Sequence, residues 1–132
     1  MSSAPAYAAT PRCAIGQVLT ANPNRDGTGT IATIFTAGAS GSRIDRVAVE
    51  AISTTTAGMV RLYIHNGTTA FLYDEILVTP ITPSSTVKAF QATCEAVTKP
   101  NLYPLVLPTG YSLRASTEKA ETFNVTAIGG DF

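Results

Sequence analysis

The chain has 132 residues, of which 45% are apolar and 14% are charged, and its 9 basic residues balance its 9 acidic residues. A chain of this length forms one domain and can bury a core without a metal or a disulfide. The composition excludes a disordered, collagen-like or coiled-coil protein. Zero net charge without a basic run removes the attraction on which binding to nucleic acids and anionic membranes depends. No stretch approaches the roughly 18 apolar residues of a membrane-spanning helix, so we expect neither a nucleic-acid nor a membrane partner.

Residues that favour β-strands dominate the composition, and threonine alone occupies 20 positions. The 10 glycines and 8 prolines are spread along the whole chain. They interrupt it too often for an amphipathic helix of three turns. The sequence therefore predicts an all-β fold, a single-domain antiparallel β-sandwich of jelly-roll-like type.

The N-terminal segment, residues 1–11, is poor in large apolar side chains. It predicts an extended arm in front of a β-sandwich domain that covers residues 12–132. Tyr7 and Pro11 are candidates within this arm for contact with a partner. The segment has neither a basic stretch nor an apolar run, so it does not indicate a secretion signal.

Short apolar runs bounded by turn residues predict eight or nine strands after the arm. The loop formers of the segment 21–29, ANPNRDGTG, predict a loop between the first two strands. Pro104 predicts an edge position for the short run that follows it. The predicted strands cover residues 12–20, 30–36, 46–51, 59–78 (a hairpin), 87–97, 105–107, 111–116 and 123–127.

The pair Asn66-Gly67 lies between two alternating runs and is the strongest local signal for a hairpin. A two-residue turn there pairs Leu62 with Phe71 and fixes the register of both strands. In that register one face of the hairpin is almost wholly apolar, and we expect it to belong to the core.

The opposite face of this hairpin is expected to be a mixed outer surface. It carries Arg61, Tyr63 and His65, which we take as candidates for contact with a partner or with another protomer. Asp74 lies diagonally to Arg61 in the predicted register, within reach of a surface ion pair worth less than about 1 kcal/mol.

Residue types that carry chemistry are few. His65 is the only histidine, and no nucleophile motif accompanies it, so we expect a structural or surface role. Cys13 and Cys94 lack metal-ligand spacing and are expected to be two buried free thiols, with a single disulfide as the alternative. Glu118 and Glu121 are expected to be solvated. The sequence thus predicts no catalytic residue, no cofactor and no metal, and therefore not an enzyme.

Five stretches that cover most of residues 41–132 resemble one family, the small virion proteins of tailed bacteriophages. The resemblance implies a capsid decoration (cement) protein, a homotrimer on the outer surface of the head whose partner is the major capsid protein. It also implies synthesis in the bacterial host cytoplasm, and it brings no catalytic residue and no small-molecule substrate. The stretches are 41–46 (GSRIDR), 55–64 (TTAGMVRLYI), 81–84 (ITPS), 105–113 (LVLPTGYSL) and 120–132 (AETFNVTAIGGDF).

The expected mechanism is bridging. Three protomers pack around a three-fold axis, and each lays its arm across a junction of capsid subunits, so that three weak contacts gain avidity. Other functions stay open at this point: a head-fibre base, a tail protein, a carbohydrate-binding module or a small hydrolase. The absence of tryptophan counts against the carbohydrate-binding module.

Overall fold

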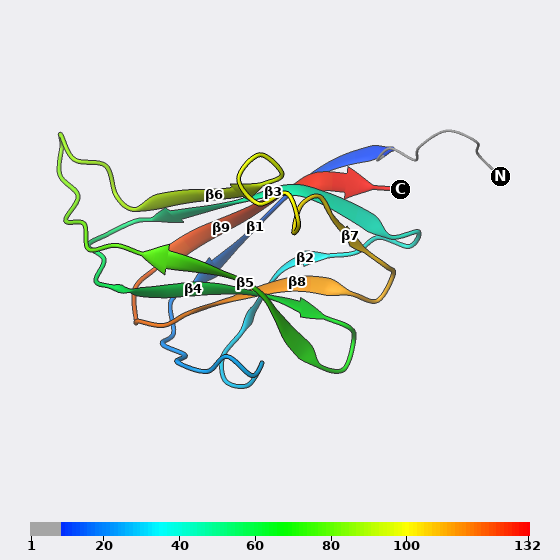
Figure 1. Cartoon of the computed structure of the whole chain (residues 1–132), viewed down its shortest axis with the longest axis horizontal. Coiled ribbons are helices and arrows are strands. Elements are labelled where there is room, and N and C mark those ends of the chain that lie inside the picture. Colours follow the sequence, from blue (N-terminus) through cyan, green and yellow to red (C-terminus); the bar gives the residue numbers. More distant parts are fainter. Residues whose placement is uncertain (1–8) are drawn as a thin grey trace.

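The computed structural model describes residues 9–132, which form nine strands and no helix (Figure 1). Within this range, no helix is long and apolar enough to cross a membrane. The strands are β1 (Thr10–Val18), β2 (Ala32–Thr36), β3 (Ser42–Ala51), β4 (Gly58–His65), β5 (Ala70–Val78), β6 (Gln91–Glu95), β7 (Leu105–Leu107), β8 (Ser112–Thr117) and β9 (Phe123–Asp131).

The strands form two antiparallel sheets that pack face to face. One sheet has the order β1-β9-β3-β6, with β7 also paired to β3, and the other has the order β2-β8-β4-β5. This confirms the predicted all-β sandwich. The pairs β1 with β9, β2 with β8, β3 with β6 and β4 with β5 are nested in sequence. The jelly-roll-like type of the sandwich stays a prediction.

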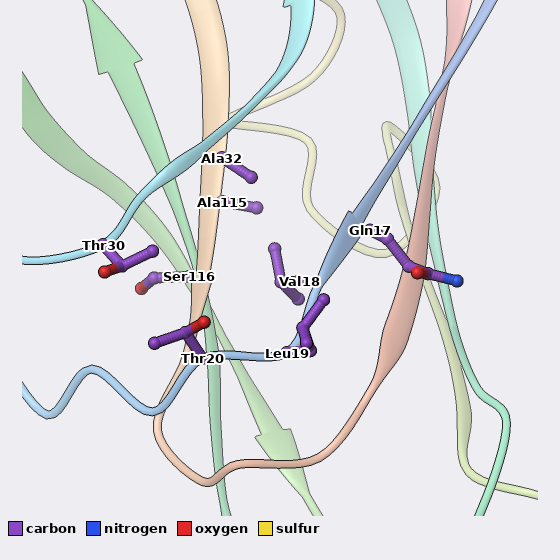
Figure 2. Close-up of a pocket in the computed structure, with 8 residues that line it drawn as sticks. All are labelled: Gln17, Val18, Leu19, Thr20, Thr30, Ala32, Ala115 and Ser116. Atoms are coloured by element: carbon purple, nitrogen blue, oxygen red, sulfur yellow. The ribbon is translucent and has the colours of Figure 1, made fainter.

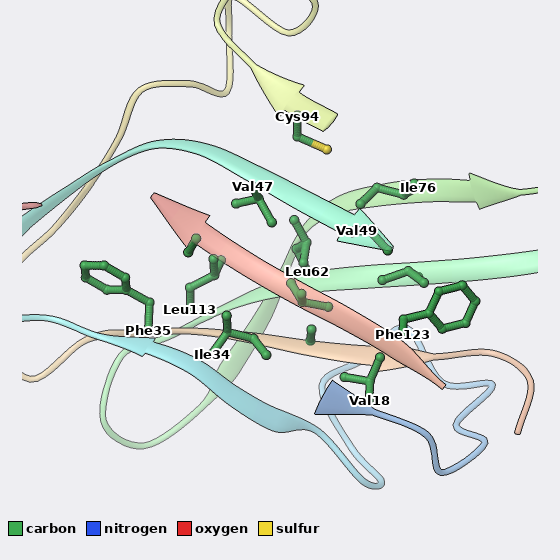
Figure 3. Close-up of a cluster of buried hydrophobic side chains, with 14 of the residues drawn as sticks. Val18, Ile34, Phe35, Val47, Val49, Leu62, Ile76, Cys94, Leu113 and Phe123 are labelled. Carbon is green, nitrogen blue, oxygen red and sulfur yellow. The ribbon is translucent and has the colours of Figure 1, made fainter. Parts of the chain in front are cut away.

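The core lies between the two sheets, where alternate residues of each strand point inward (Figure 3). Val47 and Val49 of β3 face Leu62 of β4 and Leu113 of β8 across the interior, and all four are fully buried. Phe90 and Phe123 close one end with an edge-to-face contact whose ring centroids lie 6.2 Å apart. The strand alternation read from the sequence therefore places the core residues of β3 correctly, but Phe71 of the hairpin, which was expected in the core, is 55% exposed.

β1 begins two residues earlier than predicted. Thr10 and Pro11 pair with Asp131 and Gly130 of β9, so neither belongs to a free arm. Consequently the predicted boundary between arm and domain, after residue 11, is too late by two residues. Residues 1–8 of the predicted arm, with Tyr7, lie outside the described residues.

β6 is shorter than the predicted run 87–97. Ser84 Oγ accepts hydrogen bonds from the backbone amides of Thr86 and Val87 at 3.2 and 3.1 Å and holds that end in a turn. At the other end, the amide of Lys99 donates to the carbonyl of Glu95 at 2.8 Å and turns the chain away. The edge position of the run 105–107 is confirmed, because β7 pairs with β3 alone.

The predicted register of the β4-β5 hairpin is wrong. Ile64, not Leu62, lies opposite Phe71. Four residues, 66–69, make the loop, because the Asn66 side chain accepts hydrogen bonds from the amides of the two threonines that follow Gly67. A bulge next to Tyr63 then shifts the register once more.

Candidate protein-contact surface

The outer faces of the two sheets differ in one respect. The loop 21–29 lies over the outer face of the β2-β8-β4-β5 sheet, and we call this the covered face. On the outer face of the β1-β9-β3-β6 sheet, which we call the bare face, none of the outward side chains in the described part of the chain is buried. Those side chains include Pro11, Cys13, Ile15, Gln17, Asn124, Thr126, Ile128, Arg43, Arg46, Ala48, Glu50, Gln91, Thr93, Glu95 and Val106.

Arg61 is the centre of the covered face. Its side chain is only 1% exposed, and its Nε donates to Glu75 at 3.0 Å. Its Nη1 donates to Glu118 at 3.2 Å and to the backbone carbonyl of Asn22 at 3.3 Å. Two carboxylates and one loop carbonyl therefore solvate a guanidinium that the loop has removed from water.

Tyr63 and Arg25 fasten the same loop. The Tyr63 hydroxyl donates to the backbone carbonyl of Asn24 at 2.9 Å, and Arg25 Nε contacts Glu75 at 2.8 Å. Asn22, itself buried, donates from Nδ2 to two carbonyls of the loop, at 3.0 Å each. The loop therefore has a fixed conformation that is bonded to the sheet beneath it.

Close packing of the loop depends on a glycine. Gly27 has a φ of 87°, which L side chains rarely adopt. A Cβ at this position would lie 2.4 Å from the backbone oxygen of Ala70. The loop can approach the start of β5 only because Gly27 has no side chain.

The charges of the covered face reinforce one another. Burial by itself lowers the pKa of Arg61, but its hydrogen bonds to Glu118 and Glu75 outweigh burial and leave the pKa raised. The hydrogen bond from Arg25, followed by that from Arg61, lowers the pKa of Glu75. Both groups therefore stay charged in the folded protein.

Two of the predicted contact residues lie on the covered face, and for them the prediction of an outer contact is wrong. Arg61 and Tyr63 are 1% and 0% exposed, so they cannot contact another chain while the loop is in place. The predicted ion pair of Arg61 with Asp74 is also wrong, because the altered register brings Glu75 to Arg61. Hairpin spacing alone gives no signal that a distant loop folds over this face.

The bare face has an uncharged centre. Ile15 of β1 is 67% exposed, and the strand register continues from it through Thr126 and Ala48 to Thr93. The neighbouring row of outward side chains begins with Cys13 on β1 and ends with Glu95 on β6. The centre is thus one large apolar side chain in a row of small ones, a composition suited to contact with another protein.

The end of the sandwich next to the bare face is fixed by Arg12 and Asp131. Arg12 Nη1 lies 3.0 Å from Asp131 Oδ1, and the guanidinium lies 4.0 Å from the centroid of the Phe35 ring. Hydrogen bonds from Ser42 and then Arg12 lower the pKa of Asp131. Pro11 is exposed at this end, where β1 starts beside the C-terminus of the chain (Figure 1).

His65, the last predicted contact residue, is half-buried at the end of β4. Its Nδ1 accepts a hydrogen bond from the Gly67 amide at 3.1 Å. It lines a hollow of about 340 Å³ between the loop 21–29 and the hairpin tip, together with Asp26 and Arg114. Of the predicted contact residues, Pro11 and His65 reach the surface but lie on different sheets.

A second, smaller hollow of about 140 Å³ lies at the end of the sandwich where β1 leaves the sheet. Ala32 and Ala115 point toward Val18 inside it (Figure 2). It has no charged side chain among its lining residues and is well below the roughly 300 Å³ of small-molecule sites. Its lining is Gln17, Val18, Leu19, Thr20, Thr30, Ala32, Ala115 and Ser116.

A buried ion pair near β5 was not predicted. Lys99 Nζ lies 2.6 and 2.7 Å from the two carboxylate oxygens of Asp74, and the Tyr103 hydroxyl donates to the same carboxylate at 3.3 Å. Burial raises the pKa of Tyr103 and also that of Cys94 next to this group, which reaches about 11. No signal in the sequence indicated this pair, because the predicted register placed Asp74 on the outer face of the hairpin.

The chemistry-bearing residues are otherwise scattered. In residues 9–132, no group of three or more His, Cys, Asp and Glu side chains is placed to hold a metal ion. Cys13 and Cys94 are both free, but Cys13 is exposed, which corrects the expectation of two buried thiols. Glu118 and Glu121 are not simply solvated either, since Glu118 binds Arg61 and Glu121 accepts hydrogen bonds from Thr56.

No family model, no curated protein and no solved structure matches the chain.

Proposed function

We propose that this protein is a structural component of a bacteriophage virion, a decoration (cement) protein that binds the outer capsid surface. Its partner would be the major capsid protein, and its assembled form would be a homotrimer. The resemblance of residues 41–132 to small phage virion proteins suggests this function. The observation that carries it is the bare face, with Ile15 67% exposed at its centre.

The bare face suits contact with protein rather than with a charged ligand. Its central row, from Ile15 to Thr93, contains no charged side chain, and burial of such a row against a partner costs little desolvation. Arg46 on the inner strand β3 and Glu95 on β6 lie opposite each other in the neighbouring row. The contact residues of the proposal are therefore Pro11, Cys13 and Ile15, in place of Arg61 and Tyr63.

The first described residues lie at one end of the bare face. Thr10 is held against Asp131 at the end of the bare face, so residues 1–9 are attached where a partner on that face would begin. A second contact on one partner is made at high effective concentration, and three protomers multiply the effect. Weak single contacts can in this way hold neighbouring capsid subunits together.

Co-sedimentation with undecorated phage heads tests the proposal. The wild-type protein should pellet with the heads in many copies, and light scattering should give the mass of a trimer. Ile15→Lys should weaken binding at least about tenfold, because a buried unpaired ammonium costs more than 1.4 kcal/mol. Leu77→Lys is the matched control, since Leu77 is 63% exposed on β5 and outside the bare face.

Truncation separates the two parts of the surface. Removal of residues 1–8 leaves β1 whole and should reduce binding without unfolding the domain. A wild-type protein that stays in the supernatant would refute the capsid proposal, and one that pellets only with assembled tails would move the protein to the tail. Equal binding by Ile15→Lys and Leu77→Lys would exclude the bare face as the contact.

A further inference from the structure

The tip of the β4-β5 hairpin, residues 65–69, contains an arrangement that the proposed function does not use. We propose that Asn66 is a site of spontaneous modification, at which the asparagine is converted to aspartate and isoaspartate through a cyclic succinimide. Gly67 supplies the attacking nitrogen, and His65 acts as the base. The inference rests on three neighbouring residues and is independent of any partner.

The nucleophile is the backbone nitrogen of Gly67. Its N–H donates to Nδ1 of His65 at 3.1 Å, so the unprotonated imidazole nitrogen points at the proton that must leave. An imidazole within hydrogen-bond reach of that proton is the geometry of a general base. Gly67 also leaves the nitrogen accessible, because a Cβ at this residue would meet only one atom within 4 Å, at 3.5 Å.

The electrophile is the side-chain carbonyl carbon of Asn66. Its Oδ1 accepts hydrogen bonds from the amides of Thr68 at 3.0 Å and Thr69 at 2.8 Å. These bonds hold the side chain of Asn66 against the backbone of the tip. They also place two N–H donors on the oxygen that becomes negative during attack, as in an oxyanion hole.

The reaction balances with water as the only co-reactant. Gly67 N forms a bond to Asn66 Cγ while its proton passes to His65 Nδ1. His65 then gives that proton to the side-chain nitrogen of the tetrahedral intermediate, and the Cγ–Nδ2 bond breaks to release ammonia. Water then opens the succinimide at either carbonyl, and the product is aspartate or isoaspartate.

Water has access to every participant. Asn66, Gly67 and both threonines of the tip are exposed, and the tip borders the hollow that Asp26 and Arg114 line. The isoaspartate product adds one main-chain carbon to a four-residue loop. Both products add a negative charge to the tip.

The other asparagines provide internal controls, because none is followed by glycine. Asn101 is exposed and precedes Leu102, and Asn124 precedes Val125. The larger side chain after each of these residues hinders the attacking nitrogen. Conversion should therefore be confined to Asn66.

Mass spectrometry of peptides from folded protein kept at neutral pH tests the proposal. The peptide that contains Asn66 should lose ammonia and then gain water, and isoaspartyl methyltransferase should label it. Folded wild type should react at least about tenfold faster than the same chain in denaturant, well within the range for a positioned general base. Asn101 should stay intact in the same samples.

His65→Gln is the decisive variant. Glutamine keeps an acceptor for the Gly67 amide but cannot take its proton, so conversion of Asn66 should fall by about tenfold at an unchanged thermal midpoint. An unchanged rate in a folded His65→Gln protein would overturn the role of His65. Slower conversion in the folded than in the denatured wild type would show that the hairpin protects Asn66, and would overturn the proposal.

Discussion

The covered and bare faces are the outer surfaces of the two sheets in one small sandwich, yet they differ in which side chains they bury and which they leave in solvent. On the covered face a loop buries a guanidinium and satisfies it with Glu75, Glu118 and a backbone carbonyl. On the bare face, Ile15 and Cys13 stay in contact with solvent. A side chain on the outer face of a sheet is buried or exposed according to whether another segment of the chain crosses that face. Alternation along the strand does not predict such a crossing.

The two faces also differ in what they can do. The bonds of the covered face stabilise the monomer, since they tie a loop to its own sheet. The side chains in the central row of the bare face take part in neither the core nor an ion pair. It is therefore the surface on which substitutions should alter association while stability is unchanged.

The largest expected difference is between the two thiols. The raised pKa of Cys94, about 11 against an ordinary 9.0, by itself reduces its thiolate fraction about a hundredfold. Cys13 on the bare face should therefore react with iodoacetamide at neutral pH at least about a hundred times faster than Cys94. Labelled peptides in mass spectrometry measure both rates. Similar rates would mean that the sandwich opens readily around β6.

Arg61→Met should cause the largest loss of stability on the covered face. Removal of the guanidinium leaves two carboxylates and a loop carbonyl without their partner, which should cost about 3 kcal/mol in the free energy of unfolding. Arg46→Met on the bare face is the matched control and should cost less than about 0.5 kcal/mol. Denaturant unfolding compares them, and equal losses would abolish the distinction between the faces.

Tyr63→Phe tests the hold on the loop itself. The lost hydrogen bond to the Asn24 carbonyl should cost about 1 kcal/mol. Trypsin should also cut faster after Arg25, because the loop opens more often. Tyr111→Phe is the control and should leave the rate of cleavage at Arg25 unchanged. If both variants are cut at the wild-type rate, the hydroxyl of Tyr63 does not hold the loop.

The smallest of the expected effects is the loss of stability that acid causes on the covered face. The pKa of Glu75 is lower in the folded protein than its ordinary value of 4.5. Its contribution to stability is thus fully present above that value and is lost as the pH falls through the folded pKa. Glu75→Gln should be less stable than wild type at pH 7, with a difference that narrows toward pH 3. A constant difference in urea unfolding would contradict the assignment.

The errors of the sequence prediction gather at the β4-β5 hairpin. Asn66-Gly67 does mark the turn, as predicted, but side-chain capping by Asn66 enlarges the loop to four residues and a bulge moves the register again. Asp74 and Glu75 therefore exchange the positions expected of them. Neither a cap nor a bulge leaves a signal in strand alternation, since both depend on which partners are near.

Composition and alternation determined the all-β class, the positions of most strands and the core residues of β3, because burial of every second side chain is a local, periodic property. Only the tertiary structure decided which outer face is covered, why Arg61 and Tyr63 are buried, and that Cys13 is exposed. Each of these depends on a contact between segments far apart in the chain, such as Asn22 with Arg61. Local sequence patterns do not reveal contacts between distant segments, so only the packing located the candidate contact surface.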